Sequence, residues 1–158
     1  HFSQMFPSSR YTTKGGADLI GIGLTSIGNG VDYYAQNFKD LESWEKALDN
    51  GDLPVFKGYR LSADDQLRQF VIMELMSNFS LNISRVEKEF GINFKEYFDD
   101  ALKALEEFEQ AELITVGDEK IEVSQTGTML IRNICMPFDA YLNNIPEDKR
   151  RFSKTIWF

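Results

Sequence analysis

The sequence predicts a mainly α-helical domain with a small β-hairpin, preceded by a shorter mixed segment that holds one strand. Three observations predict this fold class. Over residues 62–142, apolar side chains recur at spacings of three and four, which is typical of amphipathic helices. Within that range Ser62, Ser84 and Asn93 each stand three positions before an acid, as residues that cap helix N-termini do. A Gly-Asp-Glu turn also separates two short apolar runs, which indicates a β-hairpin.

The N-terminal segment has a different pattern. Residues 1–17 are polar and rich in Ser, Thr and Gly, which predicts a loop. Residues 18–26 (DLIGIGLTS) are apolar with alternating glycines, which predicts a short buried strand that ends at a Gly-Asn-Gly turn. Residues 40–48 predict a short helix that stops at an Asn-Gly pair.

The remaining elements follow in order from their apolar spacing. The first long helix is apolar on nearly all sides and is therefore expected at the centre of its domain, whereas the third shows a single apolar stripe. The expected elements are helices at about 63–77, 84–90, 94–112 and 125–142, with a hairpin of strands 113–116 and 120–123 before the last helix. The order of helix, helix, helix, hairpin and helix resembles a winged helix.

Composition and charge exclude several classes of function. With 158 residues, the chain suits one domain, or one domain and a fragment of a second. Its 25 acidic and 17 basic residues give a net charge of −8, which argues against nucleic acid and against an anionic membrane surface as partners. No apolar run is long enough for a membrane span, so a cytoplasmic protein is expected. One Cys excludes a disulfide framework and a four-cysteine metal site, and a Ser–His–Asp triad would have to use His1.

Three further patterns have ordinary structural explanations. The glycines of residues 15–30 lack the spacing and the Gly-Lys-Ser/Thr ending of phosphate loops, which leaves either a tightly packed strand or ligand contact around residues 25–27. Neighbouring carboxylates such as Asp64 and Asp65 are typical of solvated helix faces rather than of acid–base catalysis. Cys135 lies in an apolar helix without a nearby His, which indicates a buried inert thiol.

Arg132 leaves two alternatives open. It lies among apolar residues of the last expected helix, beside Asn133. A guanidinium group near a core must be paired or must face a cleft, because an unpaired buried charge is strongly destabilising. Arg132 is therefore expected either to pair with one of the many acids of this chain, or to anchor the carboxylate of a ligand or another domain.

Six short motifs resemble one family, the oxygen-independent coproporphyrinogen III oxidases. The resemblance covers about residues 10–158, and its C-terminal block separates the chain from the related haem-chaperone proteins. In the first half of the chain, RYTT (10–13) and DLIGIGLTSI (18–27) are similar to G-Y-T-T…D-L-x-G-x-G-x-S-x-I, and YYAQN (33–37) is similar to C-Y-A-Q-N. KGYRLS (57–62) is similar to R-G-x-x-L-T, and LMSNF (75–79) is similar to L-M-C-N-F. The C-terminal block IRNICMPFDAY (131–141) is similar to R-N-I-C-M-x-F-D-x-Y.

The resemblance implies a specific parent enzyme. Members of this family are radical S-adenosylmethionine oxidoreductases that oxidatively decarboxylate two propionates of coproporphyrinogen III, giving protoporphyrinogen IX in haem biosynthesis. Their catalytic β/α barrel carries a [4Fe–4S] cluster on a C-x-x-x-C-x-x-C triad. Since Cys135 is the only cysteine here, no cluster and no catalytic residue are expected in this chain, and it is expected to be inactive and to bind no cofactor alone.

The resemblance also divides the chain. Residues 1–60 would be the last strand of the barrel (18–26) and a linker, and residues 61–158 would be a helical C-terminal domain that covers the barrel mouth. The partners implied are the protein's own N-terminal barrel and a tetrapyrrole substrate, and without the barrel the chain is expected to self-associate through exposed apolar surface. The alternative is a non-catalytic module of a paralogue that binds haem, a tetrapyrrole or a partner protein.

There are two candidate site residues, of which only Ile27 carries over from the family. Ile27 corresponds to a family isoleucine that makes an apolar contact with a second S-adenosylmethionine, and Arg132 is the candidate substrate-binding residue. Ser8 and Ser9 stand where the family has an aromatic-Gln-Gly sequence that borders the same cofactor. Tyr33 and Ser77 replace two family cysteines.

Overall fold

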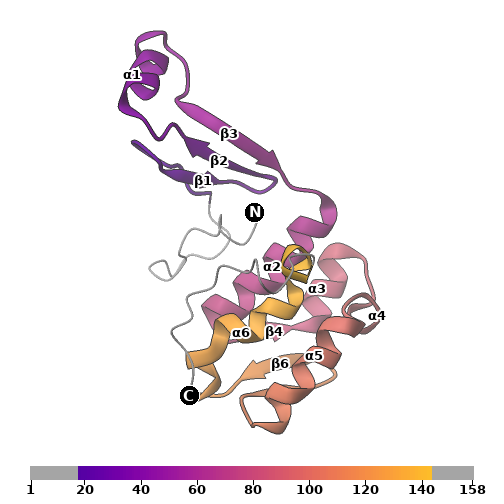
Figure 1. The fold of residues 1–158 in the computed structure, drawn as a ribbon. Helices are drawn as coiled ribbons and strands as arrows, with labels where there is room; N and C mark the ends of the chain where they lie inside the picture. The colour runs from indigo at the N-terminus through magenta and orange to yellow at the C-terminus, as the bar shows by residue number, and fades with distance from the viewer. Residues whose placement is uncertain (1–17, 144–158) are drawn as a thin grey trace. The chain divides into compact units, whose positions relative to one another are not determined.

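The computed structural model describes residues 18–143, which form helices and two small antiparallel sheets (Figure 1). They divide into two compact units, with the boundary between Asn78 and Phe79. The predicted N-terminal loop at residues 1–17, with His1, Ser8 and Ser9, lies outside the described residues. No helix within residues 18–143 is long and apolar enough to cross a membrane.

The first unit, up to residue 78, is a three-stranded antiparallel sheet with two helices. Strand order is β1-β2-β3, with Ile27 opposite Gln36 and Tyr34 opposite Tyr59. Helix α1 lies between β2 and β3 in the chain and forms the far end of this unit (Figure 1). The elements are β1 (Ile27–Asn29), β2 (Tyr33–Asn37), α1 (Leu41–Asp49), β3 (Val55–Arg60) and α2 (Ala63–Asn78).

The predicted strand over residues 18–26 is wrong. Only Leu19 pairs there, in an isolated antiparallel bridge with Asn29, and the regular strand β1 begins at Ile27. The intervening residues form a turn, because Gly23 and Thr25 have left-handed φ angles of 90° and 60° that an extended strand does not allow. Alternating glycines here therefore mark a compact loop rather than a strand.

Sequence reasoning also missed the sheet of residues 27–60. All six residues of β3 are exposed, and β2 shows no strict alternation of buried and exposed positions. Without that alternation, the period of two that identifies a half-buried strand is absent from the sequence. The helix predicted at residues 40–48 is confirmed as α1, which Asp40 caps by accepting a 2.8 Å hydrogen bond from the Ser43 amide.

Helix α2 begins with the capping arrangement that its sequence predicts. The Asp65 carboxylate accepts hydrogen bonds from the Ser62 amide at 2.9 Å and the Ser62 hydroxyl at 2.8 Å, while Ser62 Oγ accepts from the Asp65 amide at 3.1 Å. Two further bonds join α2 to the sheet of the same unit: Tyr59 donates to Asp65 at 3.3 Å, and Gln69 donates to the Tyr34 hydroxyl at 2.7 Å. The helix is thus fixed to the end of β3.

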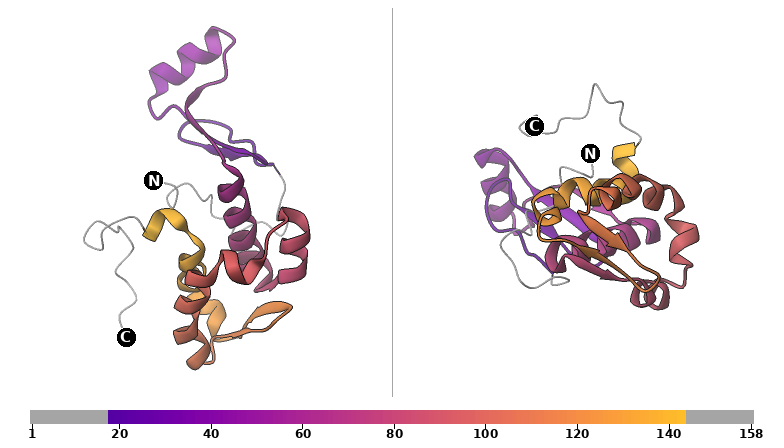
Figure 2. Two further views of the ribbon diagram at one scale, coloured as in Figure 1. Left: turned by 90° about the vertical axis from the view of Figure 1, so that its right-hand side faces the viewer. Right: turned by 90° about the horizontal axis from the view of Figure 1, so that it is seen from below.

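The second unit, from residue 79, is made of short helices and a three-stranded sheet. The predicted hairpin is confirmed as β5 and β6, and a third strand, β4, pairs with β6 so that the order is β4-β6-β5. The elements are β4 (Ser80–Asn82), α3 (Ile83–Phe90), α4 (Phe94–Tyr97), α5 (Asp99–Gln110), β5 (Ile114–Val116), β6 (Lys120–Val123), η3 (Gly127–Leu130), α6 (Ile131–Cys135), η4 (Met136–Phe138) and α7 (Ala140–Asn143). Figure 2 shows these short elements from two further sides.

Three expectations for this unit need correction. Helix α3 is capped by Asn82, which accepts a 2.8 Å hydrogen bond from the Arg85 amide, and not by Ser84. The single helix expected at 94–112 is interrupted at Phe98, which separates α4 from α5. The last helix, expected at 125–142, is a series of short helical segments: it is interrupted at Leu130, and α6 ends before Pro137, which lacks the amide donor that a continuous helix needs.

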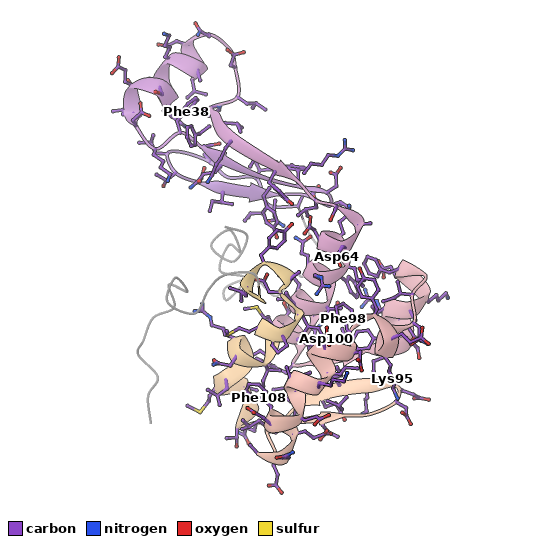
Figure 3. The ribbon with its side chains drawn as sticks, turned by 45° about the vertical axis from the view of Figure 1, so that its right-hand side comes forward. Phe38, Asp64, Lys95, Phe98, Asp100 and Phe108 are labelled. Atoms are coloured by element: carbon purple, nitrogen blue, oxygen red, sulfur yellow. The ribbon has the colours of Figure 1, made fainter. Side chains whose placement is uncertain are left out.

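Aromatic side chains form the core of the second unit. Phe98 is 2% exposed, and its ring centroid lies 4.9 Å from that of Phe94 and 5.3 Å from that of Phe138. Phe98 points inward from the junction of α4 and α5, whereas Lys95 and Asp100 project from the surface (Figure 3). The kink at Phe98 therefore places a ring in the centre of the cluster, which stabilises the unit despite its short helices.

We expect Phe98→Ala to lower the free energy of unfolding by about 3–5 kcal/mol, since it leaves a cavity among buried rings. Urea denaturation followed by circular dichroism measures the change. The control is Met129→Ala, where the side chain is 83% exposed and an effect within about 0.5 kcal/mol is expected. Equal effects of the two substitutions would contradict the packing role of Phe98.

Candidate functional site

The candidate residue Ile27 is held between a tight loop and the neighbouring strand. Its side chain is half-buried, and its backbone pairs with Gln36 of β2. A Cβ atom on Gly21 would lie 2.9 Å from the Ile27 carbonyl carbon, so residue 21 packs against the Ile27 backbone and must lack a side chain. The position of Ile27 therefore depends on the conformation of the loop over residues 19–26.

The side-chain amide of Asn37 holds that loop. Asn37 Nδ2 donates to the carbonyl oxygen of Gly23 at 3.0 Å, to Ser26 Oγ at 3.0 Å and to the carbonyl oxygen of Gly21 at 3.4 Å. The Ser26 hydroxyl in turn donates to the Gly23 carbonyl at 2.7 Å. Sequence reasoning missed Asn37, because its acceptors lie 11 to 16 positions earlier and no local pattern connects them.

The second candidate, Arg132, lies on the exposed face of α6. The buried face of the same helix consists of Ile134 and Cys135. The expectation that Arg132 lies near the core is wrong, because α6 is a short helix that presents Arg132 and Asn133 to solvent. Among residues 18–143, no acid forms an ion pair with Arg132.

The acid nearest in sequence to Arg132 has a different role. Asp139 is buried, and its Oδ1 accepts hydrogen bonds from the amides of Tyr141 at 2.9 Å and Leu142 at 3.3 Å. These bonds satisfy the start of α7, as a helix-capping carboxylate does. Ile27 and Arg132 belong to different units and were linked only by the family resemblance.

The single thiol is not a reactive group. Cys135 is buried, and burial raises its pKa to about 12, so the thiol stays neutral at physiological pH. The structure thus supports the expected inert cysteine. Within residues 18–143, no three His, Cys, Asp or Glu side chains lie together in a group that could hold a metal ion.

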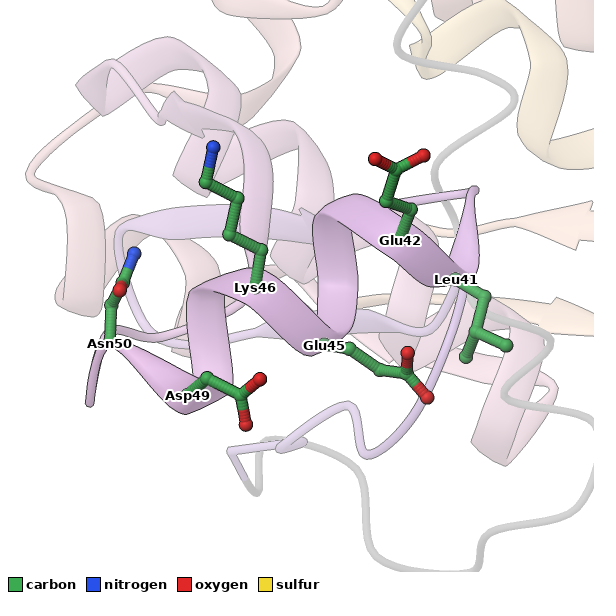
Figure 4. Close-up of a pocket in the computed structure, with 6 residues that line it drawn as sticks. All are labelled: Leu41, Glu42, Glu45, Lys46, Asp49 and Asn50. Carbon is green, nitrogen blue, oxygen red and sulfur yellow. The ribbon is translucent and has the colours of Figure 1, made fainter.

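The carboxylates singled out in the sequence serve structural roles. Asp64 pairs with Arg68 at 2.9 Å, and Asp99 pairs with Lys103, each within one helix. A shallow hollow along α1 is also largely acidic, but its side chains point in different directions and converge on no common point (Figure 4). Its lining residues are Leu41, Glu42, Glu45, Lys46, Asp49 and Asn50. No general acid or base is identified among these groups.

The family that the sequence resembles uses a [4Fe–4S] cluster and S-adenosylmethionine, and the described residues suit only the second of these. A [4Fe–4S] cluster does not fit, because it needs several thiolates and the chain offers one buried, neutral thiol. For S-adenosylmethionine, Ile27 can supply an apolar contact, and the Gly21–Ser26 loop beside it exposes further apolar side chains.

Comparison with known proteins points to one family. Residues 61–130 match the family model of the HemN C-terminal domain. The oxygen-independent coproporphyrinogen III oxidase of Helicobacter pylori (strain J99) is 49% identical, and that of Pseudomonas aeruginosa is 38% identical, both over 146 residues. These matches cover 92% of this chain but 31% of each relative, so the chain spans about a third of their length.

A solved structure shows the same fold. The coproporphyrinogen III oxidase (HemN) of Escherichia coli, described as a radical SAM enzyme, matches with a TM-score of 0.77 and 39% identity. The match covers 83% of this chain and 30% of that protein. The mixed arrangement of helices and small antiparallel sheets is therefore shared with an experimentally known protein.

We expect the Cys135 thiol to resist alkylation. The shift of its pKa from 9.0 to about 12 lowers the thiolate fraction at pH 8 by about a thousandfold, so iodoacetamide should react at least that much faster after unfolding in urea. Burial of a neutral thiol stabilises the fold below the unfolded pKa of 9.0, and this contribution is lost as the pH rises toward 12. Mass spectrometry measures the labelling, and comparable rates in native and unfolded protein would contradict the assignment.

Proposed function

We propose that this chain, whose residues 61–130 match the family model of the HemN C-terminal domain, is the C-terminal part of an oxygen-independent coproporphyrinogen III oxidase. The observation that carries the proposal is the 49% identity to such an oxidase over 92% of this chain. The parent protein oxidatively decarboxylates two propionates of coproporphyrinogen III to give protoporphyrinogen IX in haem biosynthesis. It is a radical S-adenosylmethionine enzyme, as the Escherichia coli protein of the same fold is described.

Within that parent, the chain has a covering and positioning role. Residues 1–60 are the end of the catalytic barrel and its linker, and residues 61–158 are a winged-helix-like domain that covers the barrel mouth. The order α2, β4, α3, α5, β5 and β6, with the antiparallel sheet β4-β6-β5, supports the winged-helix assignment. The acidic face of these helices favours packing over contact with nucleic acid.

The cofactors divide between the two parts of the parent. The cluster and the S-adenosylmethionine bound to it belong to the upstream barrel, where together they supply the radical that starts the oxidation. The side chain of Ile27 contributes apolar contact to the second S-adenosylmethionine. Exposed apolar side chains of the first unit support a surface made for the barrel: Ile20, Ile22, Val31 and Leu53.

The proposal is tested with the full-length protein that contains this chain. Supplied with S-adenosylmethionine and a reductant under anaerobic conditions, it should convert coproporphyrinogen III to protoporphyrinogen IX, measured by fluorescence after oxidation to the porphyrins. This chain alone, after reconstitution with iron and sulfide, should show neither conversion nor stoichiometric cluster absorbance, since one thiolate cannot replace three. Conversion by the chain alone, or none by a cluster-loaded full-length protein, would overturn the proposal.

Arg132 is the proposed anchor for a substrate carboxylate. The substrate carries four propionates, and a chain with a net charge of −8 would repel it unless specific cations face it. Arg132 is exposed and forms no ion pair within the described residues, so it keeps its donors for a ligand. A guanidinium group binds a carboxylate through two parallel hydrogen bonds, which a lysine ammonium group does not reproduce.

We expect Arg132→Lys in the full-length protein to lower kcat/KM for coproporphyrinogen III by about tenfold to a hundredfold, because one charge-assisted hydrogen bond is lost. The melting temperature should be unchanged. The control is Arg85→Lys, which alters an exposed arginine paired with Glu89 in the same unit and should leave both quantities unchanged. A melting temperature that falls in step with activity would show that Arg132 is structural.

A further inference from the structure

The loop over residues 19–26 is closed by a set of polar contacts. At its base, Leu19 and Asn29 exchange backbone hydrogen bonds of 2.8 and 2.9 Å. At its centre, Asn37 is 8% exposed and directs its amide group at the loop, where two N–H hydrogens serve three acceptors. Such a buried amide is retained only where its hydrogen bonds are made, because a buried unpaired donor is strongly unfavourable.

Apolar burial within the described residues does not explain the loop. Ile20 is 80% exposed and Ile22 is 90% exposed, so neither side chain contributes to a core of the described residues. The loop also holds Thr25 at a φ of 60°, a conformation that residues with a side chain rarely adopt. Polar contacts thus maintain a strained backbone at Thr25, and such strain is typical of functional segments.

The hydrogen bonds of Asn37 also fix the residues that contact Ile27. Ser26, which accepts from Asn37 Nδ2, immediately precedes Ile27, and its carbonyl oxygen accepts from the Asn37 backbone amide at 2.9 Å. Gly21, whose carbonyl also accepts from Asn37, packs against the Ile27 backbone. Asn37 therefore holds both Ser26, which precedes Ile27 in the sequence, and Gly21, which packs against the Ile27 backbone.

We propose that Asn37 is a positioning residue, whose side-chain amide closes the Gly21–Ser26 loop and thereby fixes Ile27 for contact with the second S-adenosylmethionine. The inference rests on the proposed function, in which Ile27 touches that cofactor. In this role Asn37 contacts the loop and not the cofactor.

The decisive substitution is Asn37→Asp in the full-length protein. A carboxylate has the same shape but no donor, and it would face the carbonyl oxygens of Gly21 and Gly23. Equilibrium dialysis against labelled S-adenosylmethionine counts the equivalents bound. We expect the Kd of the second equivalent to rise at least tenfold while that of the first, bound at the cluster, is unchanged. The melting temperature should fall, because the new carboxylate is buried against carbonyl oxygens.

Further variants keep the test decisive. Ser26→Ala removes one acceptor of the same network and should raise the second Kd about threefold, even if Asn37→Asp prevents folding. Asn50→Asp makes the same chemical change at the exposed end of α1 and should have no effect. Ile27→Ala should weaken the second equivalent as well.

The outcomes separate the two proposals. Unchanged binding in both Asn37→Asp and Ser26→Ala, with weakened binding in Ile27→Ala, would overturn the role of Asn37 and leave the cofactor contact standing. Unchanged binding in Ile27→Ala would overturn the contact itself. A joint loss of both equivalents and of thermal stability, in Ser26→Ala as in Asn37→Asp, would show that the network is only structural.

Discussion

The elements of this chain are short, so many backbone groups lie outside regular hydrogen bonding, and buried polar side chains satisfy them. The buried polar or charged residues of the described chain are Asn37, Asp65 and Asp139, and each bonds to backbone groups. Asn37 closes the loop before β1, Asp65 begins α2, and Asp139 begins α7. Because an unpaired buried backbone group is costly, these side chains decide where the chain turns.

This constraint explains which parts of the fold the sequence predicted. Helix α2 was predictable because Ser62 and Asp65 are three positions apart and an apolar run follows them, so both the cap and the packing face are local patterns. The loop before β1 was not, since Asn37 is distant in sequence from the carbonyls it binds. A run of alternating glycines and isoleucines has the same local pattern whether it extends or turns.

Local ambiguity also explains the smaller errors. Asn82 and Ser84 are both good caps, and pairing of β4 with β6 sets the helix start at Ile83, a contact across almost forty residues that no capping pattern contains. Residues 94–112 are largely helical, as their apolar stripe predicted, but the helix is interrupted at Phe98, whose ring lies in the aromatic cluster. In both cases tertiary packing overrode a correct local preference.

The candidate site was predictable only in part, for a related reason. Ile27 came from a motif shared with a family, and Arg132 came from its position among apolar residues of a predicted helix. The exposure of Arg132 required the structure, because an arginine among apolar residues has the same sequence pattern on a buried and on an exposed face of a helix. The structure adds that neither residue has redox or acid–base chemistry of its own. The thiol is buried and neutral, and Asp65, Asp139 and Asp64 serve as helix caps or as a partner in an ion pair. In the function proposed above, the chain therefore contributes binding and orientation, through the apolar side chain of Ile27 and the guanidinium group of Arg132.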